Sequence, residues 1–444
     1  MIFPIGDLKA EQNCLKTLFP NDENDIVPKV AEAILNLPEN THITFRYTND
    51  AAINLLKGIS IIVGRLPLDQ MSQPLQQLCS YQVTPLSRML EEQQNYAPST
   101  EQSGNSKHEH NLRSDPSFWI DRLAAIIRYT NPDVRESEEH PCLKVLAGIW
   151  PIISEILNKY QTVGRIQERT CRCIRYAMRS IGKQAAPLLG PLVKQMVELY
   201  ATHNHSCFLY LGSILVDEFA LVSDQCTQGL LDMMQAFIEP TFNRLQQENG
   251  LKNNPDTVDD FFRLCARFLQ RCPIPFLQSS IVTPIVNCAL LSCSLDHKDA
   301  NLSVMKFFYS LLSCGRAHSH TNNNNNSSND HNAAINAQKQ TLVHQIVQIH
   351  GAALVVNLLQ ASIYYLHTYM MSDVADVLFE MKLVNAQQLN ENLRTALESL
   401  PKKNSGGCVT ATAAQLDEFH GAVMRAEAAK NVTHALKDFT RLYR

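Results

Sequence analysis

The sequence has few charged residues for its length and no long apolar run. Charged side chains make up 18% of the 444 residues and apolar ones 45%, a balance that favours a folded chain over a disordered one. No stretch of 18 residues is apolar without a charge or a helix breaker, so we expect no membrane-spanning segment. The first residues, MIFPIGDLKAEQN, lack a basic region followed by an apolar run, and we expect no secretory signal peptide.

Catalytic and cofactor-binding motifs are also missing. The sequence has no phosphate-binding loop, no GxGxxG, no HExxH and no nucleophile elbow, so we expect neither enzyme activity nor a cofactor. The thirteen cysteines follow no framework, which indicates reduced thiols in the cytosol or nucleus. Two groups of candidate metal ligands are better explained as a helix junction and as a polar insert, so we expect no metal site: His203, His205 and Cys207, and His318, His320 and His331.

Helical periodicity is present almost everywhere. Apolar residues recur at spacings of three and four, and no convincing alternating strand pattern occurs. Helix pairs begin near Pro141, Ala185, Asp224 and Pro273, at intervals of roughly 40 to 50 residues, the period of HEAT or armadillo repeats. The sequence therefore predicts an all-α fold, a HEAT-repeat α-solenoid in which each pair buries its apolar face on its neighbours.

Two polar stretches divide this pattern. Residues 94–115 have no periodicity, and residues 317–337 begin with an Asn-rich, low-complexity run. We expect both to be disordered inserts. They separate N-terminal helical repeats (1–93) from central HEAT repeats (116–316) and from C-terminal HEAT repeats (338–444).

The stretch GRIQERTCRCIRYAMRSIGK, residues 164–183, concentrates positive charge in a chain whose net charge is −4. It holds five arginines and one lysine but one acid, Glu168. A helix at 100° per residue places all six cations in one arc of about 120°, with apolar residues opposite. Tyr176 falls on the cationic side, and Glu168 is spaced to pair with Arg172. We call five of these cations the arginine row: Arg165, Arg169, Arg172, Arg175 and Arg179.

The choice of arginine indicates a binding role. A face needed only for solubility would mix Glu with Lys, whereas clustered arginines repel one another. Each guanidinium presents a planar fork that grips carboxylate or phosphate with two parallel hydrogen bonds. The row therefore predicts a site for a phosphopeptide, an acidic peptide or nucleic acid. Two alternatives stay open: a helical-repeat nucleic-acid binder, and a scaffold whose arginines pair with acids of a neighbouring repeat.

Five blocks carry a family resemblance: RIQERTCRCIRYAMR, HSCFLYLGSILVDEF, NGLKNNPDTVDDFFRL, LDHKDANLSVMKFF and the ending ALKDFTRLYR. They resemble the transportin-SR family, importin-β-type nuclear import receptors for serine/arginine-rich splicing factors. The resemblance runs from about residue 27 to the C-terminus and corresponds to the C-terminal half of that family's pattern. The N-terminal repeats that make the main Ran-GTP contacts in this family have no counterpart, and the repeats are shortened near residues 48–51.

The resemblance implies how such a chain would work. A superhelix of HEAT repeats would hold the arginine row on its concave face, where it would bind the phosphorylated Arg-Ser domain of cargo. Tyr176 and Lys183 would add further cargo contacts. Ran-GTP and nucleoporins are the other implied partners, with no membrane and no direct nucleic acid. The protein would shuttle between cytoplasm and nucleus through the nuclear pore.

Overall fold

The computed structural model describes residues 49–91, 115–135, 137–316, 326–403 and 409–443. The described residues are helical almost throughout, and the β structure among them is one isolated bridge between Lys403 and Val409. The chain divides into two compact units, Met1–Gln184 and Ala185–Arg444. The all-α class predicted from the spacing of apolar residues is confirmed for the described part of the chain.

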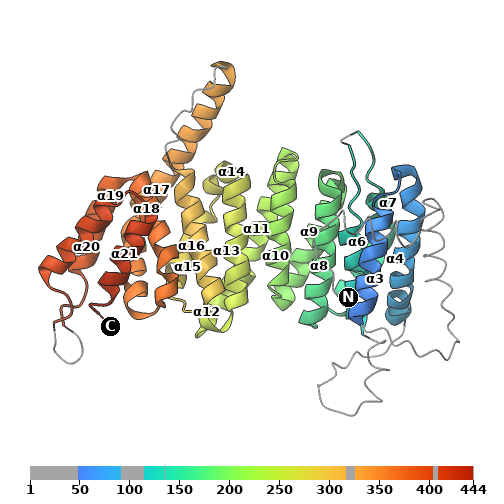
Figure 1. Ribbon diagram of the computed structural model, residues 1–444, viewed down its shortest axis with the longest axis horizontal. Helices are drawn as coiled ribbons and strands as arrows, with labels where there is room; N and C mark the ends of the chain where they lie inside the picture. The colour runs from blue at the N-terminus through green and yellow to red at the C-terminus, as the bar shows by residue number, and fades with distance from the viewer. Residues whose placement is uncertain (1–48, 92–114, 136, 317–325, 404–408, 444) are drawn as a thin grey trace, which may run out of the picture. The chain divides into compact units, whose positions relative to one another are not determined.

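Unit 1 contains helices stacked in two layers (Figure 1). α6 packs against α3 on one side and α8 on the other, and these three helices form the first layer. α4 and α7 pack together in the second layer. The helices are α3 (Asn49–Val63), α4 (Leu68–Glu91), α6 (Pro116–Tyr129), α7 (Pro141–Lys159) and α8 (Gly164–Ile181), followed by a 3-10 turn, η1 (Gly182–Ala185).

Unit 2 repeats the arrangement with more helices. In one layer α10, α13, α16, α18 and α21 pack in that order, and most of the other helices line the second layer. The helices are α9 (Ala186–His203), α10 (Cys207–Phe219), α11 (Asp224–Leu245), α12 (Gly250–Asn253), α13 (Pro255–Arg271), α14 (Pro273–Gln278), α15 (Val282–Ser292), α16 (Lys298–Cys314), α17 (Asn326–Tyr364), η2 (Thr368–Met370), α18 (Met371–Val384), α19 (Ala386–Glu398), α20 (Ala413–Arg425) and α21 (Ala429–Thr440).

Cross-repeat hydrogen bonds show the period of the stack. The Gln184 side chain accepts from the backbone of His140, 44 positions earlier. The Ser303 hydroxyl donates to Asp259 and the Lys382 amine donates to the Ala426 carbonyl, again across 44 positions. These bonds therefore join neighbouring helix pairs across a separation within the roughly 40 to 50 residues expected of such repeats. The helical-repeat architecture predicted from the sequence is confirmed.

Two described helices are long and apolar enough to cross a membrane by length and composition alone, namely α7 and residues Ala333–Tyr364 of α17. The apolar window of α7 is 44% buried inside the structure and that of α17 is 50% buried. α7 packs against α4 and α8, and α17 packs against α19 and its neighbours. Both therefore behave as core helices of the stack.

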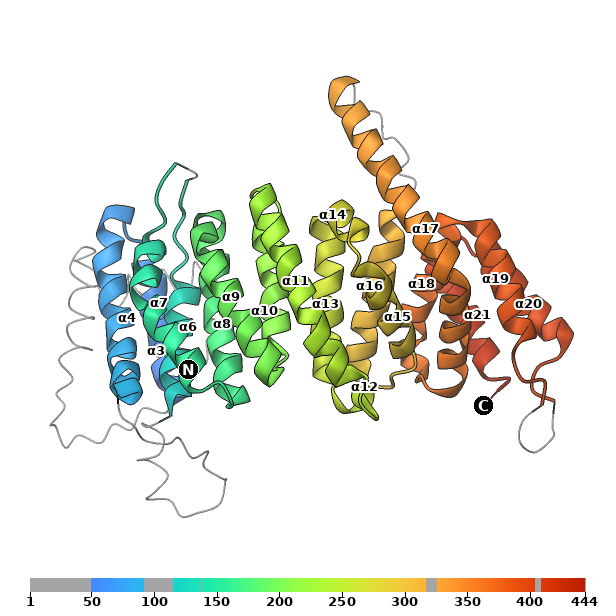
Figure 2. The same cartoon turned by 180° about the vertical axis from the view of Figure 1, so that it is seen from behind.

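The expected inserts fall mainly where placement is not described. Residues 94–114 and 317–325 lie outside the described residues, as do residues 1–48 beside the expected shortening at 48–51. Residues 326–337 differ from the expected disordered insert, because they form the first turns of α17. These turns stand clear of the neighbouring helices in Figures 1 and 2. Good helix formers such as Ala333, Ala334 and Ala337 allow an established apolar helix to extend backwards at little cost.

Candidate functional site

Helix α8 is fixed at both ends by its own sequence. Buried Gln167 donates from Nε2 to the carbonyl oxygens of Leu157 and Tyr160, at 3.0 and 2.9 Å. These contacts satisfy carbonyls at the end of α7 and anchor the first turn of α8 on it. The helix ends at Gly182, whose φ of +61° is a conformation that side chains with a Cβ rarely adopt. Gln167 therefore ties the first turn of α8 to α7, and Gly182 ends the helix.

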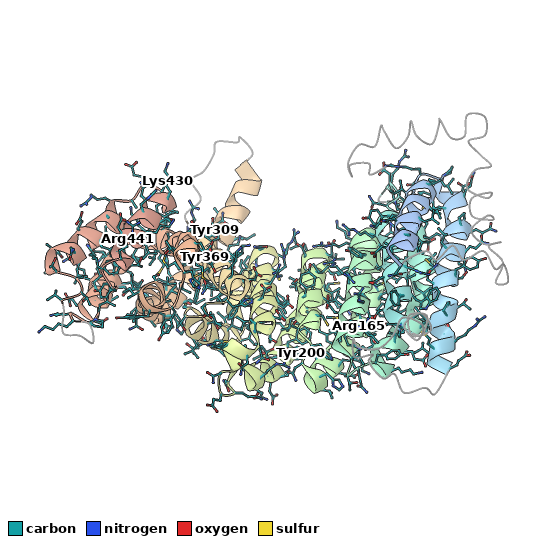
Figure 3. The ribbon with its side chains drawn as sticks, turned by 60° about the horizontal axis from the view of Figure 1, so that its bottom comes forward. Arg165, Tyr200, Tyr309, Tyr369, Lys430 and Arg441 are labelled. Carbon is teal, nitrogen blue, oxygen red and sulfur yellow. The ribbon has the colours of Figure 1, made fainter. Side chains whose placement is uncertain are left out.

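The amphipathic helix predicted from the sequence is confirmed. The predicted apolar back is buried in the structure: Ile166, Cys173, Ile174, Ala177, Met178 and Ile181. Burial raises the pKa of the Cys173 thiol to about 12, so it is a neutral core group despite the arginine beside it. The arginine row lies on the other side of the helix, and Figure 3 labels its first member, Arg165.

The first half of the row is paired with Asp115, the N-cap of α6, and with Asp121 inside that helix. Arg165 lies 2.7 Å from Asp115 and also donates to the Ser117 hydroxyl at 2.9 Å. Asp121 is only 12% exposed and pairs with both Arg169 and Arg172, the latter at 2.8 Å. The three arginine side chains, Arg165, Arg169 and Arg172, remain 45%, 32% and 37% exposed. Each is therefore held by a carboxylate while part of its guanidinium faces solvent.

Partial burial and the charge of a neighbouring arginine both lower the pKa of Arg169, in the middle of the row. Partial burial lowers the pKa of Arg169, and the neighbouring charge of Arg172 lowers it further, while Asp115 acts in the opposite direction. An added anion at this point would relieve the repulsion between the two guanidinium groups. Asp121 already does so in part, because its two oxygens accept from one arginine each.

The second half of the row has an aromatic environment. The Arg175 guanidinium carbon lies 4.6 Å from the centre of the Tyr176 ring, and that of Arg128 from α6 lies 5.0 Å from the same ring. Arg128 also donates from Nη1 to the Tyr176 hydroxyl at 3.1 Å. Arg179 is exposed on the last turn. Tyr176 is thus brought to the cationic face, as the sequence predicted, and it lies between arginines of two helices.

Two details of the predicted site differ in the structure. The sequence predicted that Lys183 would lie on the cationic face, but α8 ends at Ile181 and Gly182 turns the chain, so helical geometry does not place Lys183 there. The carboxylate partner of Arg172 is Asp121 on α6 rather than Glu168 on its own helix. Asp121 is favoured because its largely buried carboxylate lies beside the arginines, where a charge pair is screened less than at the exposed Glu168.

Three further residues belong to this site and were not expected from the sequence: Asp115, the N-cap of α6, and Asp121 and Arg128 within that helix. The contacts of this segment with α8 have similar separations: Ser117–Arg165, Asp121–Arg169 and Arg128–Tyr176 are each 48 positions apart, Asp115–Arg165 is 50 and Asp121–Arg172 is 51. Such similar separations identify two parallel neighbours in one layer. Charged residues at this separation were visible in the sequence, but only the packing of the layers shows that they meet.

A second, shorter set of arginines lies in unit 2. On α13, Arg263 pairs with Asp259 at 2.8 Å, while Arg267 and Arg271 pair with Asp217 of α10 at 3.7 and 2.5 Å. Asp259 and Asp217 thus oppose these three arginines. We interpret this set as ion pairing that joins α10 to α13.

The candidate metal ligands are not gathered into a site. His203 and His205 stack with ring centres 5.9 Å apart at the α9–α10 junction. Across the helices and turns that the structure describes, no three His, Cys, Asp or Glu residues are grouped to hold a metal ion. His318 and His320, and the side chain of His331, lie outside the described part.

Two segments of the chain match known domain families. Residues 140–245 match the Transportin-3/Importin-13 fourth TPR domain, a segment that begins at α7 and includes α8 with the arginine row. Residues 24–87 match the Transportin-3/Importin-13 third TPR domain.

Relatives and a solved structure agree with these matches. Transportin MOS14 of Arabidopsis thaliana is 28% identical over 265 residues, which is 59% of this chain and 25% of that protein. Human importin-13 is 22% identical over 425 residues, which is 94% of this chain and 41% of that protein. The chain thus spans less than half the length of these relatives.

A solved structure described as "Importin13 cytosolic state" superposes with a TM-score of 0.73 at 15% identity. The match covers 98% of this chain and 44% of that chain, and at this identity it shows a shared fold. Two segments of the chain are therefore similar to Transportin-3/Importin-13 domains, and the chain is similar in sequence to transportin MOS14 and importin-13.

Proposed function

We propose that the chain is the cargo-binding part of a nuclear import receptor and binds the phosphorylated Arg-Ser segments of splicing factors on α8. The observation that carries this proposal is the arginine row, which lies opposite the buried face of one helix and keeps its guanidinium groups partly in solvent. On α8 itself the five arginines stand beside one acid, Glu168. No catalytic role is part of the proposal.

Phosphoserine fits this surface better than a carboxylate does. It carries about −1.5 to −2 charges and three acceptor oxygens, so one group can accept from two guanidinium forks at once. An unphosphorylated Arg-Ser segment is strongly basic and would be repelled by the row. Phosphorylation would therefore switch cargo binding on through the sign of the charge.

The remaining steps of transport are proposed from the relatives. Release by Ran-GTP, passage along nucleoporins and shuttling between cytoplasm and nucleus are what an importin or transportin would require. The proposal assigns none of these to a residue of this chain, because the chain spans only part of the relatives' length.

The direct test is a fluorescence-polarisation titration with an Arg-Ser repeat peptide in phosphorylated and unphosphorylated forms. We expect the phosphorylated peptide to bind at least about tenfold more tightly, since each charge-assisted hydrogen bond contributes about 1.5 kcal/mol or more. Equal affinity for the two forms would show that the row does not distinguish a phosphorylated peptide from an unphosphorylated one.

Asp121 is expected to compete with the cargo phosphate, because its carboxylate already pairs with the guanidinium groups of Arg169 and Arg172. Replacing Asp121 with Asn should tighten binding of the phosphorylated peptide by about threefold to tenfold, the gain from removing one competing charge near the surface. The same titration measures it, with the exposed Asp133→Asn as a control for net charge. Weaker binding by Asp121→Asn would mean that the carboxylate is needed to aim the two arginines.

The ion pairs also favour a second candidate, a purely structural role for the first half of the row. Arg165, Arg169 and Arg172 join α6 to α8 through Asp115 and Asp121, as arginines of a scaffold would. Under that role, peptide binding would not depend on these arginines, whereas the thermal stability of unit 1 would.

A further inference from the structure

Cations and tyrosines alternate across three neighbouring helices of unit 1. The cation–tyrosine cluster consists of Lys57 on α3, Arg128 and Tyr129 on α6, and Arg175 and Tyr176 on α8. The Lys57 amine lies 5.6 Å from the centre of the Tyr129 ring, and the Arg128 guanidinium carbon lies 5.3 Å from it. Arg128 and Arg175 lie 5.0 and 4.6 Å from the Tyr176 ring. The cluster therefore crosses the layer rather than following α8.

The cations contributed by α3 and α6 differ from the first half of the row in how they are held. Among the residues that the structure describes, no carboxylate pairs with Lys57 or Arg128, whose polar contacts are with Asn54 and the Tyr176 hydroxyl. Arg169 and Arg172, in contrast, share Asp121. An anion arriving at Arg128 has no described carboxylate to displace.

Contact with a tyrosine holds a guanidinium group in position to bind an anion. The Arg128 guanidinium carbon lies 5.0 Å from the centre of the Tyr176 ring, and the Tyr176 hydroxyl accepts from Nη1, so the side chain is held in place. The other N–H groups lie at the edge of the fork, which is where phosphate oxygens bind. Because Arg128 is exposed and already ordered, binding there costs less side-chain entropy than at a mobile arginine.

The spacing suits a repeated phosphopeptide. Every second residue of an extended chain lies on the same side, about 7 Å from the next. Neighbouring helix axes lie about 8–10 Å apart, a difference that long Arg and Lys side chains can span. Phosphates on alternate residues could thus meet cations on α8, α6 and α3 in turn.

We propose that the cation–tyrosine cluster is a second anion-binding site, at which Arg128 binds a phosphate of the same phosphorylated Arg-Ser segment. The inference rests on the proposed function and extends it from α8 to α6 and α3. The segment leaves the arginine row near Arg175 and crosses the layer over Tyr176 and Tyr129.

The test is the titration of the full chain with the phosphorylated Arg-Ser peptide. Arg128→Ala is expected to lower affinity about tenfold, the loss of one charge-assisted hydrogen bond to a held fork. The control Arg65→Ala removes the same charge from an exposed position of unit 1 and should change affinity by less than about twofold. Equal effects of the two variants would overturn the second site.

Tyr176 separates a binding role from a charge effect, since its replacement leaves the net charge unchanged. Tyr176→Phe keeps the ring under both guanidinium groups and should cost about twofold, while Tyr176→Leu should approach the loss seen for Arg128→Ala. The thermal unfolding curves of both variants should match that of the wild type. A wild-type affinity in Tyr176→Leu would show that the stack has no part in binding.

Two further results distinguish this inference from the proposed function. If the wild type binds the phosphorylated peptide and Arg175→Ala weakens it while Arg128→Ala does not, the second site alone fails. If neither form of the peptide binds the wild type, the proposed function fails with it. A single-stranded RNA oligonucleotide should not displace the peptide. RNA binding with the same dependence on Arg128 and Tyr176 would overturn the assignment to a phosphopeptide.

Discussion

Replacing Arg165, Arg172 and Arg175 together with Ala is expected to lower the affinity for phosphorylated Arg-Ser peptide by about a thousandfold. Three charge-assisted hydrogen bonds at about 1.5 kcal/mol each correspond to roughly three decades of affinity. The three positions come from both halves of the row. Arg165 pairs with Asp115, Arg172 pairs with Asp121, and Arg175 lies against the Tyr176 ring. Fluorescence polarisation at fixed ionic strength measures the loss, because salt screens such contacts.

The matched control for the triple variant removes the same charge elsewhere. Arg65, Arg88 and Arg394 are exposed, and their combined replacement with Ala should leave affinity within about threefold of the wild type. The triple variant also takes partners from Asp115 and Asp121, so its fold must be checked by circular dichroism and thermal unfolding. A folded triple variant that binds as tightly as the control would refute the assignment of the row to cargo.

Phe262→Ala is expected to destabilise unit 2 by about 3–5 kcal/mol, the usual cost of removing a buried phenylalanine ring. Phe262 is fully buried, and its ring centre lies 5.3 Å from that of Phe261 and 5.5 Å from that of Phe307 on α16. The lost contacts join two neighbouring helix pairs, on which the stability of a repeat stack depends. Urea unfolding and hydrogen exchange of α13 and α16 measure the change.

Leu291→Ala supplies the comparison for that variant. Leu291 is 69% exposed on α15, and its truncation should alter stability by no more than about 0.5 kcal/mol. Because helical repeats can unfold in parts, hydrogen exchange should show the effect of Phe262→Ala first at the α13–α16 contact. A uniform small change across unit 2, equal to that of Leu291→Ala, would mean that this aromatic contact does not support the stack.

The arginine helix was predictable from the sequence because its signal is local. An apolar residue at every third or fourth position fixes which side of a helix is buried, and the arginines fall on the other side by geometry. The burial of Ile166, Ile174 and Met178 follows that rule. The end of the helix was not predicted. Nothing in the periodicity shows that Gly182 adopts a positive φ, which separates Lys183 from the row.

The partners of the arginines were not predictable, because they depend on which helices become neighbours. Glu168 lies one turn from Arg172 in sequence, yet Asp121 on another helix takes that place. Arg128 and Tyr176, 48 positions apart, meet only because α6 and α8 run parallel in one layer. Many pairs of residues share such a separation, and sequence periodicity does not select among them.

By itself the sequence determined an all-α chain of repeated helix pairs and one helix with a buried apolar side and a row of five arginines. Those properties follow from the 3.6-residue period, which acts within a single helix. The tertiary structure alone decided that Asp115 and Asp121 hold the first half of the row and that Arg128 and Tyr176 join the second half. Contacts between helices are set by how apolar faces pack, and that packing brings together polar residues that have no local reason to meet.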